Sequence, residues 1–396
     1  MTAPPRKLQT VGLFAGIGGI EAGLARHGHQ AILLSEIDPI ASVVLRGRFA
    51  QSKIIGDVRD LKCLPDCDLV AAGFPCQDLS QCGKTQGITG HRSSLVKEVF
   101  RLVESAKNRP SWLMLENVPF MLQLDSGSAM EFITSEVTRL GYRWAYRTVN
   151  ALSFGLPQRR MRVVFIASRD ADPSEVLFAD NAAERSAAEN PKGYGFYWTE
   201  GSKGLGWAID SVPTLKGGSA VGIPSPPALW IPADRQIVTI DIRDAERLQG
   251  FRADWTKLPD EKRGGRWKLV GNAVCVKVAA WIGKRLARPG TVVCKKGKQL
   301  VKGKSWPLSA CVEGTTAWEV LASNSPLIAN SPSIVEFLRF PTRPLSARAT
   351  YGFLHRAVNS RLRFEEQFLE DVQHHLETVA TGQHERFRKI LFEGVA

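Results

Sequence analysis

A short apolar run that ends in Gly73-Phe74-Pro75-Cys76 restricts the fold of this chain more than any other stretch. Residues 68–72 read Asp-Leu-Val-Ala-Ala, which predicts a buried strand of a parallel sheet, and such sheets bind ligands at their carboxyl edge. Proline fixes a backbone torsion beside Cys76, and Gly73 permits a tight exit from the strand. The segment therefore predicts one thiol held in a defined direction. The alternative is that Cys76 is a small buried hydrophobic residue, as most free cysteines are.

Two further predicted strands end in residues suited to a nucleoside. Residues 7–14 lead into a glycine-rich turn ahead of a predicted helix at 20–27, so the backbone at Gly16 and Gly18 can approach a ligand. The strand predicted at 31–35 ends in Glu36, whose carboxylate can accept hydrogen bonds from ribose hydroxyls. A dinucleotide fingerprint needs a third glycine where this chain has Glu21, which disfavours a nicotinamide cofactor.

Charged residues also follow or precede two later apolar runs. A strand predicted at 112–115 ends in Glu116-Asn117-Val118, and Gln158-Arg159-Arg160-Met161-Arg162 stands just before the apolar run 163–166. A carboxylate at a strand end beside a nucleophile can act as an acid, and a guanidinium offers forked donors that are always charged. These residues predict acid catalysis and anion or carbonyl binding near Cys76.

Together these motifs resemble the cytosine-C5 DNA methyltransferases. The resemblance rests on Pro75-Cys76-Gln77, Glu116-Asn117-Val118, the Gln158–Arg162 group, Phe14-x-Gly16-x-Gly18 and Gly271-Asn272-Ala273-Val274, and it covers about three quarters of the chain. It implies an α/β, Rossmann-like fold with a doubly wound, mostly parallel sheet, a small irregular target-recognition domain and a C-terminal extension. It also implies methyl transfer from S-adenosylmethionine to cytosine in double-stranded DNA.

The resemblance assigns roles to individual residues. Cys76 would add to C6 of a cytosine flipped out of the duplex, while Glu116 and Arg162 polarise the ring. Arg160 would face the phosphate backbone. The implied cofactor residues are Phe14, Gly16, Gly18, Glu36, Ile37, Pro39, Asp57, Val58 and Asn272.

The positive charge is concentrated in one segment. The net charge of the chain is +13, and residues 243–304 hold 17 Lys and Arg against 5 Asp and Glu. Such a block is typical of a protein that binds a polyanion, although it can also be an ordinary solvated surface.

The glycine-rich segment 80–91 resembles the loop that closes over the substrate in this family. The predicted DNA contacts are Ser80, Gln81, Arg160, Thr214, Leu215, Arg263, Arg266 and Lys268.

Changes in pattern suggest domain boundaries. We predict a catalytic domain at 1–167 and 243–287, with a target-recognition domain at 168–242, where periodicity disappears. A basic linker is expected at 288–304, followed by an extension of unknown role at 305–396.

The resemblance implies a bacterial modification enzyme of a restriction or phage-defence system, and we expect it to be cytoplasmic and nucleoid-associated. The seven cysteines are irregularly spaced, so neither a disulfide framework nor a metal site is expected, and no apolar run is long enough to span a membrane. Two alternatives stay open: an RNA cytosine methyltransferase, and a non-catalytic DNA-binding protein of the same fold.

Overall fold

The computed structural model describes residues 5–74, 95–184, 188–218, 225–258, 265–301 and 305–380. The chain divides into two units, and neither is one continuous segment. The first unit comprises Met1–Phe154, Met161–Arg185 and Ala273–Ala329, and the second comprises Gly155–Arg160, Ser186–Asn272 and Asn330–Ala396.

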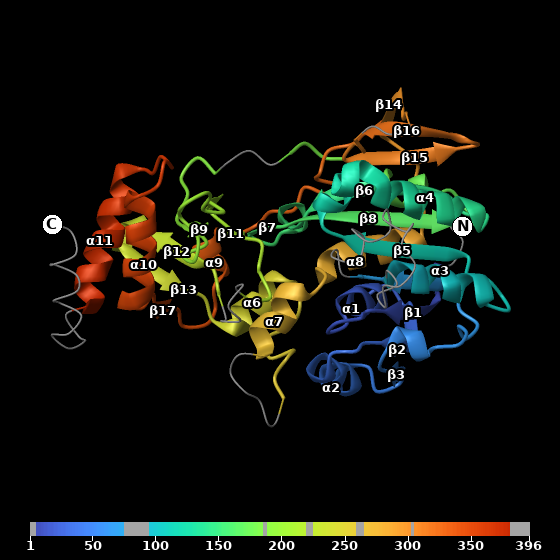
Figure 1. Ribbon diagram of the computed structural model, residues 1–396, viewed down its shortest axis with the longest axis horizontal. Coiled ribbons are helices and arrows are strands. Elements are labelled where there is room, and N and C mark those ends of the chain that lie inside the picture. The colour runs from blue at the N-terminus through green and yellow to red at the C-terminus, as the bar shows by residue number, and fades with distance from the viewer. Residues whose placement is uncertain are drawn as a thin grey trace. The chain divides into compact units, whose positions relative to one another are not determined.

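A ten-stranded sheet with the order β14-β16-β15-β6-β8-β5-β4-β1-β2-β3 forms the centre of the first unit (Figure 1). Its strands are β1 (Gln9–Leu13), β2 (Gln30–Ser35), β3 (Lys53–Ile55), β4 (Leu69–Ala72), β5 (Trp112–Asn117), β6 (Arg143–Asn150), β8 (Met161–Ser168), β14 (Lys295–Gln299), β15 (Ser309–Glu313) and β16 (Thr316–Leu321). Strands β3, β2, β1, β4 and β5 are parallel, whereas β8 is antiparallel to both β5 and β6. The order in which strands are added reverses between β1 and β4, because the chain runs from β1 outward to β2 and β3 and then returns to β4 on the other side of β1. Doubly wound sheets bind ligands at such a point. The predicted α/β class with a doubly wound sheet is confirmed.

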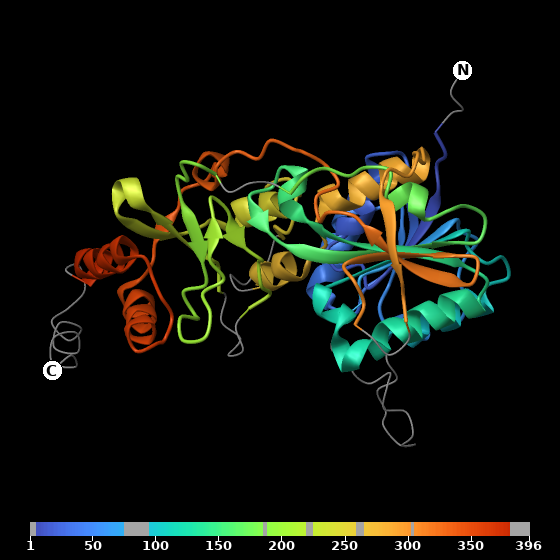
Figure 2. The same ribbon diagram turned by 90° about the horizontal axis from the view of Figure 1, so that it is seen from above.

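Helices cover both faces of this sheet (Figure 2). Helices α3 (Leu95–Ser105) and α4 (Ser128–Arg139) share one hydrophobic core with alternate residues of the strands, including Val11 and Leu13 of β1. On the other face α1 (Gly19–Ala25) packs on α8 (Val276–Ala287), and α2 (Pro39–Arg48) joins β2 to β3. No helix in the described ranges is both long and apolar enough to cross a membrane.

The C-terminal part of the chain is not the separate extension that the sequence predicted. Strand β14 lies inside the expected linker, and β15 pairs with β6, so the segment up to Ala329 belongs to the first unit. The sequence Lys-Lys-Gly-Lys-Gln of β14 has no apolar alternation, because this strand is an exposed edge on which lysine blocks further pairing. Strand formation there depends on partners far away in the sequence, so a local pattern could not reveal it.

The second unit has its own five-stranded sheet with the order β10-β9-β12-β13-β17. Its strands are β9 (Tyr194–Phe196), β10 (Ala208–Ile209), β12 (Ala228–Ile231), β13 (Gln236–Thr239) and β17 (Arg343–Pro344), and β7 (Gln158–Arg159) pairs separately with β11 (Val212–Pro213). Its helices are α6 (Ile242–Leu248), α7 (Gly265–Asn272), α9 (Ile334–Phe337), α10 (Ala347–Val358) and α11 (Glu366–Ala380).

The last two helices complete the core of the second unit. The ring of Phe196 lies 5.0 Å from that of Phe353 in α10 and 5.2 Å from that of Phe368 in α11. The fully buried carboxylate of Asp371 in α11 accepts hydrogen bonds from the Trp230 indole at 2.9 Å and from Arg235 at 2.7 Å. Residues beyond the predicted recognition segment are therefore part of the same folded body.

Candidate active site

The loop after β1 is held in a tight, unusual conformation. Phe14, Gly16 and Gly18 all have positive φ, at 55°, 57° and 82°. A Cβ atom added to Gly18 would lie 2.2 Å from the Phe49 ring, so glycine is required there by close packing as well as by φ. A Cβ added to Gly16 would meet nothing within 4 Å. The loop is thus fixed on one side by packing and open on the other above Gly16.

Glu36 ties this loop to the end of β2. One carboxylate oxygen accepts a hydrogen bond from the Gly16 amide at 2.7 Å, and the other accepts one from the Asp38 amide at 2.8 Å. A carboxylate oxygen can accept more than one hydrogen bond, so Glu36 can still receive a ribose hydroxyl. Beside it, the Ile37 side chain is 66% exposed, which is unusual for isoleucine and gives a flat base an apolar surface.

Asp57 is engaged within the protein more than the sequence suggested. It caps the short 3-10 helix η1 (Val58–Asp60) by accepting a hydrogen bond from the Arg59 amide at 2.9 Å, and it pairs with the Arg59 guanidinium. The hydrogen bond from Arg59 lowers the pKa of Asp57. Val58 is buried under this turn.

A buried ion pair lies at the ends of β5 and β8. Glu116 is the fifth residue of β5, Arg162 is in β8, and Arg162 Nε lies 3.1 Å from Glu116 Oε1. Their side chains are only 8% and 13% exposed. Because the strands are neighbours, the two groups are positioned by the sheet itself.

The next residue of β5 connects this pair to the end of β4. Asn117 donates a hydrogen bond from Nδ2 to the Phe74 carbonyl at 3.0 Å, and its Oδ1 accepts one from the Val118 amide at 2.8 Å. A Cβ added to Gly73 would lie 3.8 Å from Glu116 Oε2, so the exit of β4 faces the Glu116 carboxylate. Cys76, Ser80 and Gln81 follow directly but lie outside the described residues, as do the rest of the predicted closing loop and Arg263.

The predicted DNA contacts at Arg160, Thr214, Leu215, Arg266 and Lys268 fall in the second unit, and several of them have partners within the protein. Arg160 is buried, with its guanidinium 3.3 Å from the Leu215 carbonyl and 3.4 Å from that of Gly271, which differs from the predicted phosphate contact. The Leu215 side chain is also buried, in an apolar cluster. The Thr214 hydroxyl donates to the Arg159 carbonyl at 2.9 Å. The type of a residue does not by itself predict whether its side chain points into the protein, so these orientations could not be predicted from the sequence.

The basic block is divided between the two units. Arg266 donates to the buried carboxylate of Glu246 at 2.8 Å and to the Thr256 hydroxyl at 2.9 Å, so it has a structural role that the sequence did not predict. Lys268 and Asn272 of α7 are exposed. Several cations of the block form ion pairs within the protein, namely Arg243, Arg247, Arg266 and Arg285.

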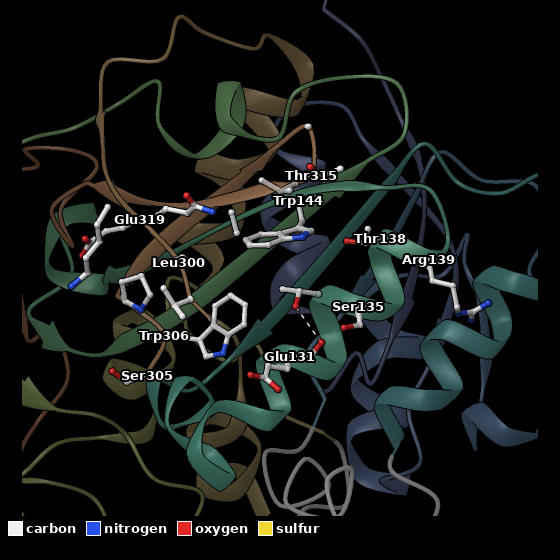
Figure 3. Close-up of a pocket in the computed structure, with 18 residues that line it drawn as sticks. Glu131, Ser135, Thr138, Arg139, Trp144, Leu300, Ser305, Trp306, Thr315 and Glu319 are labelled. Carbon is white, nitrogen blue, oxygen red and sulfur yellow. Dashed lines mark hydrogen bonds between the residues drawn. The ribbon is translucent and has the colours of Figure 1, made fainter. Parts of the chain in front are cut away.

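A cavity of about 740 Å³ lies elsewhere in the first unit, between α4 and the strands β14 to β16 (Figure 3). Trp144 and Trp306 line it, with their ring centres 6.1 Å apart. Glu36, Glu116 and Arg162 do not line it. The candidate site at the carboxyl ends of the parallel strands is therefore separate from this cavity.

Comparison with known proteins gives the family. The C-5 cytosine-specific DNA methylase family matches residues 8–202. The Type II methyltransferase M2.BsuMI of Bacillus subtilis strain 168 is 47% identical over 380 residues, covering 92% of this chain and 97% of that protein. The chain belongs to the C-5 cytosine-specific DNA methylase family.

More distant relatives match over shorter ranges or in fold alone. The Type II methyltransferase M.BanI of Aneurinibacillus aneurinilyticus is 35% identical over 186 residues, which is 46% of this chain and 43% of that protein. The crystal structure of S. pombe Dnmt2 methyltransferase aligns with a TM-score of 0.55 at 17% identity, covering 71% of this chain and 98% of that one. That likeness concerns the fold.

Membership of the DNA methylase family confirms the predicted activity and methyl donor. The chain is a DNA (cytosine-5-)-methyltransferase that uses S-adenosylmethionine. The residues at the carboxyl ends of β1 and β2 fit this molecule, because the open side of Gly16, the half-buried Glu36 carboxylate and the exposed Ile37 offer space, a ribose acceptor and an apolar surface.

Two residues that support this methylase site were not predicted from the sequence. Asn117 was noted only as part of a motif, yet it fastens β5 to Phe74. Glu21 was noted only as the residue that breaks a glycine fingerprint, yet its side chain is buried next to β1. Glu21 could have been singled out in the sequence because it is a charged residue within the otherwise apolar start of the predicted helix.

Proposed function

We propose that this methyltransferase is the modification enzyme of a type II restriction-modification system and methylates C5 of cytosine within one specific duplex sequence. Its 47% identical relative in Bacillus subtilis is a Type II methyltransferase, which supports this proposal. Protection of cellular DNA requires the enzyme to act where the chromosome lies, in the bacterial cytoplasm.

The Glu116–Arg162 pair is the observation that carries the proposed active site. Both side chains sit at the carboxyl edge of the parallel strands, with Glu116 on the strand next to β4, whose exit leads to Cys76, and Arg162 on the strand after that. Cytosine presents an acceptor at N3 and a carbonyl at O2, which suit a carboxylic acid and a guanidinium. We therefore assign N3 and the amino group to Glu116, and O2 to Arg162.

Methylation at carbon requires covalent activation. C5 of cytosine is a poor nucleophile, and addition of the Cys76 thiolate to C6 moves electron density onto C5. Hydrogen bonds from Glu116 and Arg162 stabilise the negative charge that develops on the ring. After methyl transfer, removal of the C5 proton by a base and expulsion of Cys76 restore the aromatic ring.

The ring can reach these groups only outside the double helix, so the target nucleotide is flipped out. S-adenosylmethionine supplies an electrophilic methyl group on its sulfonium. Phe14, Gly16 and Gly18 shape its binding loop, Glu36 accepts from its ribose, and Ile37 packs on its base. Contacts of Asp57 and Asn272 with the cofactor remain predictions.

The second unit is assigned to target recognition, with its C-terminal helices included. We propose that Thr214 and Lys268 contact DNA, since their side chains are not buried. The internal contacts of Arg160, Leu215 and Arg266 would instead stabilise the fold of the second unit.

Mapping of methylated cytosines in DNA from cells that express the protein tests this proposal. We expect 5-methylcytosine at one recurring sequence, and loss of methylation with Glu116→Gln, whose amide cannot supply the acid proton. Methylation of transfer RNA alone, or of cytosines without a shared sequence, would contradict the proposal.

A further inference from the structure

A buried carboxyl group lies directly below the glycine loop. Glu21 is in the first turn of α1 and its residue is 3% exposed. A Cβ added to Gly12 of β1 would lie 2.1 Å from Glu21 Oε1 and 2.7 Å from the Leu34 side chain of β2. The Glu21 carboxyl therefore fills the side-chain space of residue 12, two positions before Phe14.

One oxygen of this carboxyl has no hydrogen-bond partner among the described residues. Glu21 Oε2 is buried and unpaired. A buried polar atom without a hydrogen-bond partner destabilises the folded state, so an apolar side chain at this position would give a more stable fold. A carboxyl retained at such a cost is suited to a ligand that arrives later.

The charges around Glu21 favour its protonated form in the free protein. Burial raises the pKa of Glu21 to about 7; its own backbone amide opposes this shift, and the negative charge of Glu36 adds to it. Strand β1 contributes no charged residue. Helix α8 contributes Lys277 and Lys284, whose charges act on Arg26 and His27 at the far end of α1.

We propose that Glu21 is a second carboxyl group of the cofactor site, which loses its proton when S-adenosylmethionine binds and so favours this cation over its neutral product. The proposal rests on the proposed placement of the cofactor in the loop that contains Gly16 and Gly18. S-adenosylmethionine carries a sulfonium, whereas S-adenosylhomocysteine carries a neutral thioether. Only the sulfonium adds a positive charge that stabilises an ionised Glu21, and the released proton passes to solvent.

Calorimetry in two buffers of different ionisation enthalpy measures this proton directly. If binding lowers the pKa of Glu21 by about one unit from about 7, S-adenosylmethionine should release about 0.4 proton at pH 7. S-adenosylhomocysteine should release close to none. Affinity for the methyl donor should rise about sevenfold from pH 5.5 to pH 8 relative to affinity for the product.

Glu21→Gln keeps the size of the side chain and removes its charge. We expect this variant to lose the proton release and about tenfold of the preference for the methyl donor at pH 8. Glu36→Gln tests the cofactor site separately, because the ribose is common to both ligands and the affinities for both should fall.

The outcomes separate this inference from the proposed function. Wild-type protein that binds S-adenosylmethionine without releasing a proton would overturn the role of Glu21 and leave the cofactor site standing. Unchanged preference in folded Glu21→Gln would do the same. If Glu36→Gln bound each of the two ligands as tightly as the wild-type protein does, that result would instead contradict the cofactor site itself.

Discussion

At the scale of residues, strand ends were readable from the sequence and side-chain orientations were not. Glu36 and Glu116 each follow an apolar run, and the structure places both at the carboxyl edge of the sheet. Arg160 and Arg266 have the same charge as a phosphate-binding residue but point inward to acceptors. Those acceptors lie 55 and 20 residues away in the sequence, so no local pattern identifies them.

Lys268 and Arg266 test this distinction, because they are two residues apart in α7. Lys268→Ala should reduce the slope of log affinity for DNA against log salt by about 0.9 and leave thermal stability unchanged. Arg266→Ala should cost about 3–5 kcal/mol of folding free energy, since it leaves the buried Glu246 carboxylate without the cation that neutralises its charge. Salt titrations of binding and thermal melts of both variants measure these effects. An identical salt slope for Lys268→Ala would remove that residue from the DNA interface.

At the scale of elements, the parallel strands and the helices between them could be predicted from apolar patterns in the sequence. Each of these elements is buried against its neighbours, and burial requires apolar residues. Long apolar runs such as 112–115 sit in the middle of the sheet, and the predicted strand 143–150 is β6. Strands β14 to β16 and the pairing of β15 with β6 were not predicted, because β14 is an exposed edge strand and neither β14 nor β16 has a continuous buried apolar pattern.

Close packing between α1 and α8 gives a prediction for two helical glycines. A Cβ on Gly23 would lie 2.5 Å from Ala279 Cβ and 2.6 Å from the Val276 carbonyl, whereas a Cβ on Gly47 of α2 would meet nothing within 4 Å. Gly23→Ala should therefore destabilise the protein by about 1–3 kcal/mol. Gly47→Ala should stabilise it by about 0.5–1 kcal/mol through helix propensity. Thermal melts that rank the two variants in the opposite order would contradict the packing of α1 on α8.

At the scale of the whole molecule, the C-terminal quarter is shared between the two units. The motifs that predicted the family end near residue 287, and nothing in them specifies that later strands extend the first sheet or that α10 and α11 fill the second core. These pairings are made across long sequence separations, which sequence periodicity does not encode.

Removal of residues 305–396 should therefore prevent stable folding. The cut deletes β15 and β16 as well as Phe353 and Phe368, and loss of two buried phenylalanines alone costs about 6–10 kcal/mol, comparable with a typical folding free energy of about 5–15 kcal/mol. A shorter cut after Ala380 keeps every described contact and should leave the protein folded. Hydrogen exchange and thermal melting compare the two chains. A cooperative melt of the longer truncation at the wild-type temperature would show that the tail is dispensable.

The most direct test of the account is a covalent trap at Cys76. Duplex DNA that carries 5-fluorocytosine at the mapped target should form a stable adduct with the protein in the presence of S-adenosylmethionine, because fluorine cannot be removed as a proton is. Cys76→Ser should abolish this adduct and keep cofactor binding, since a hydroxyl is almost never ionised near neutral pH. An adduct that persists in Cys76→Ser, or its absence from wild-type protein that methylates the same sequence, would contradict the mechanism.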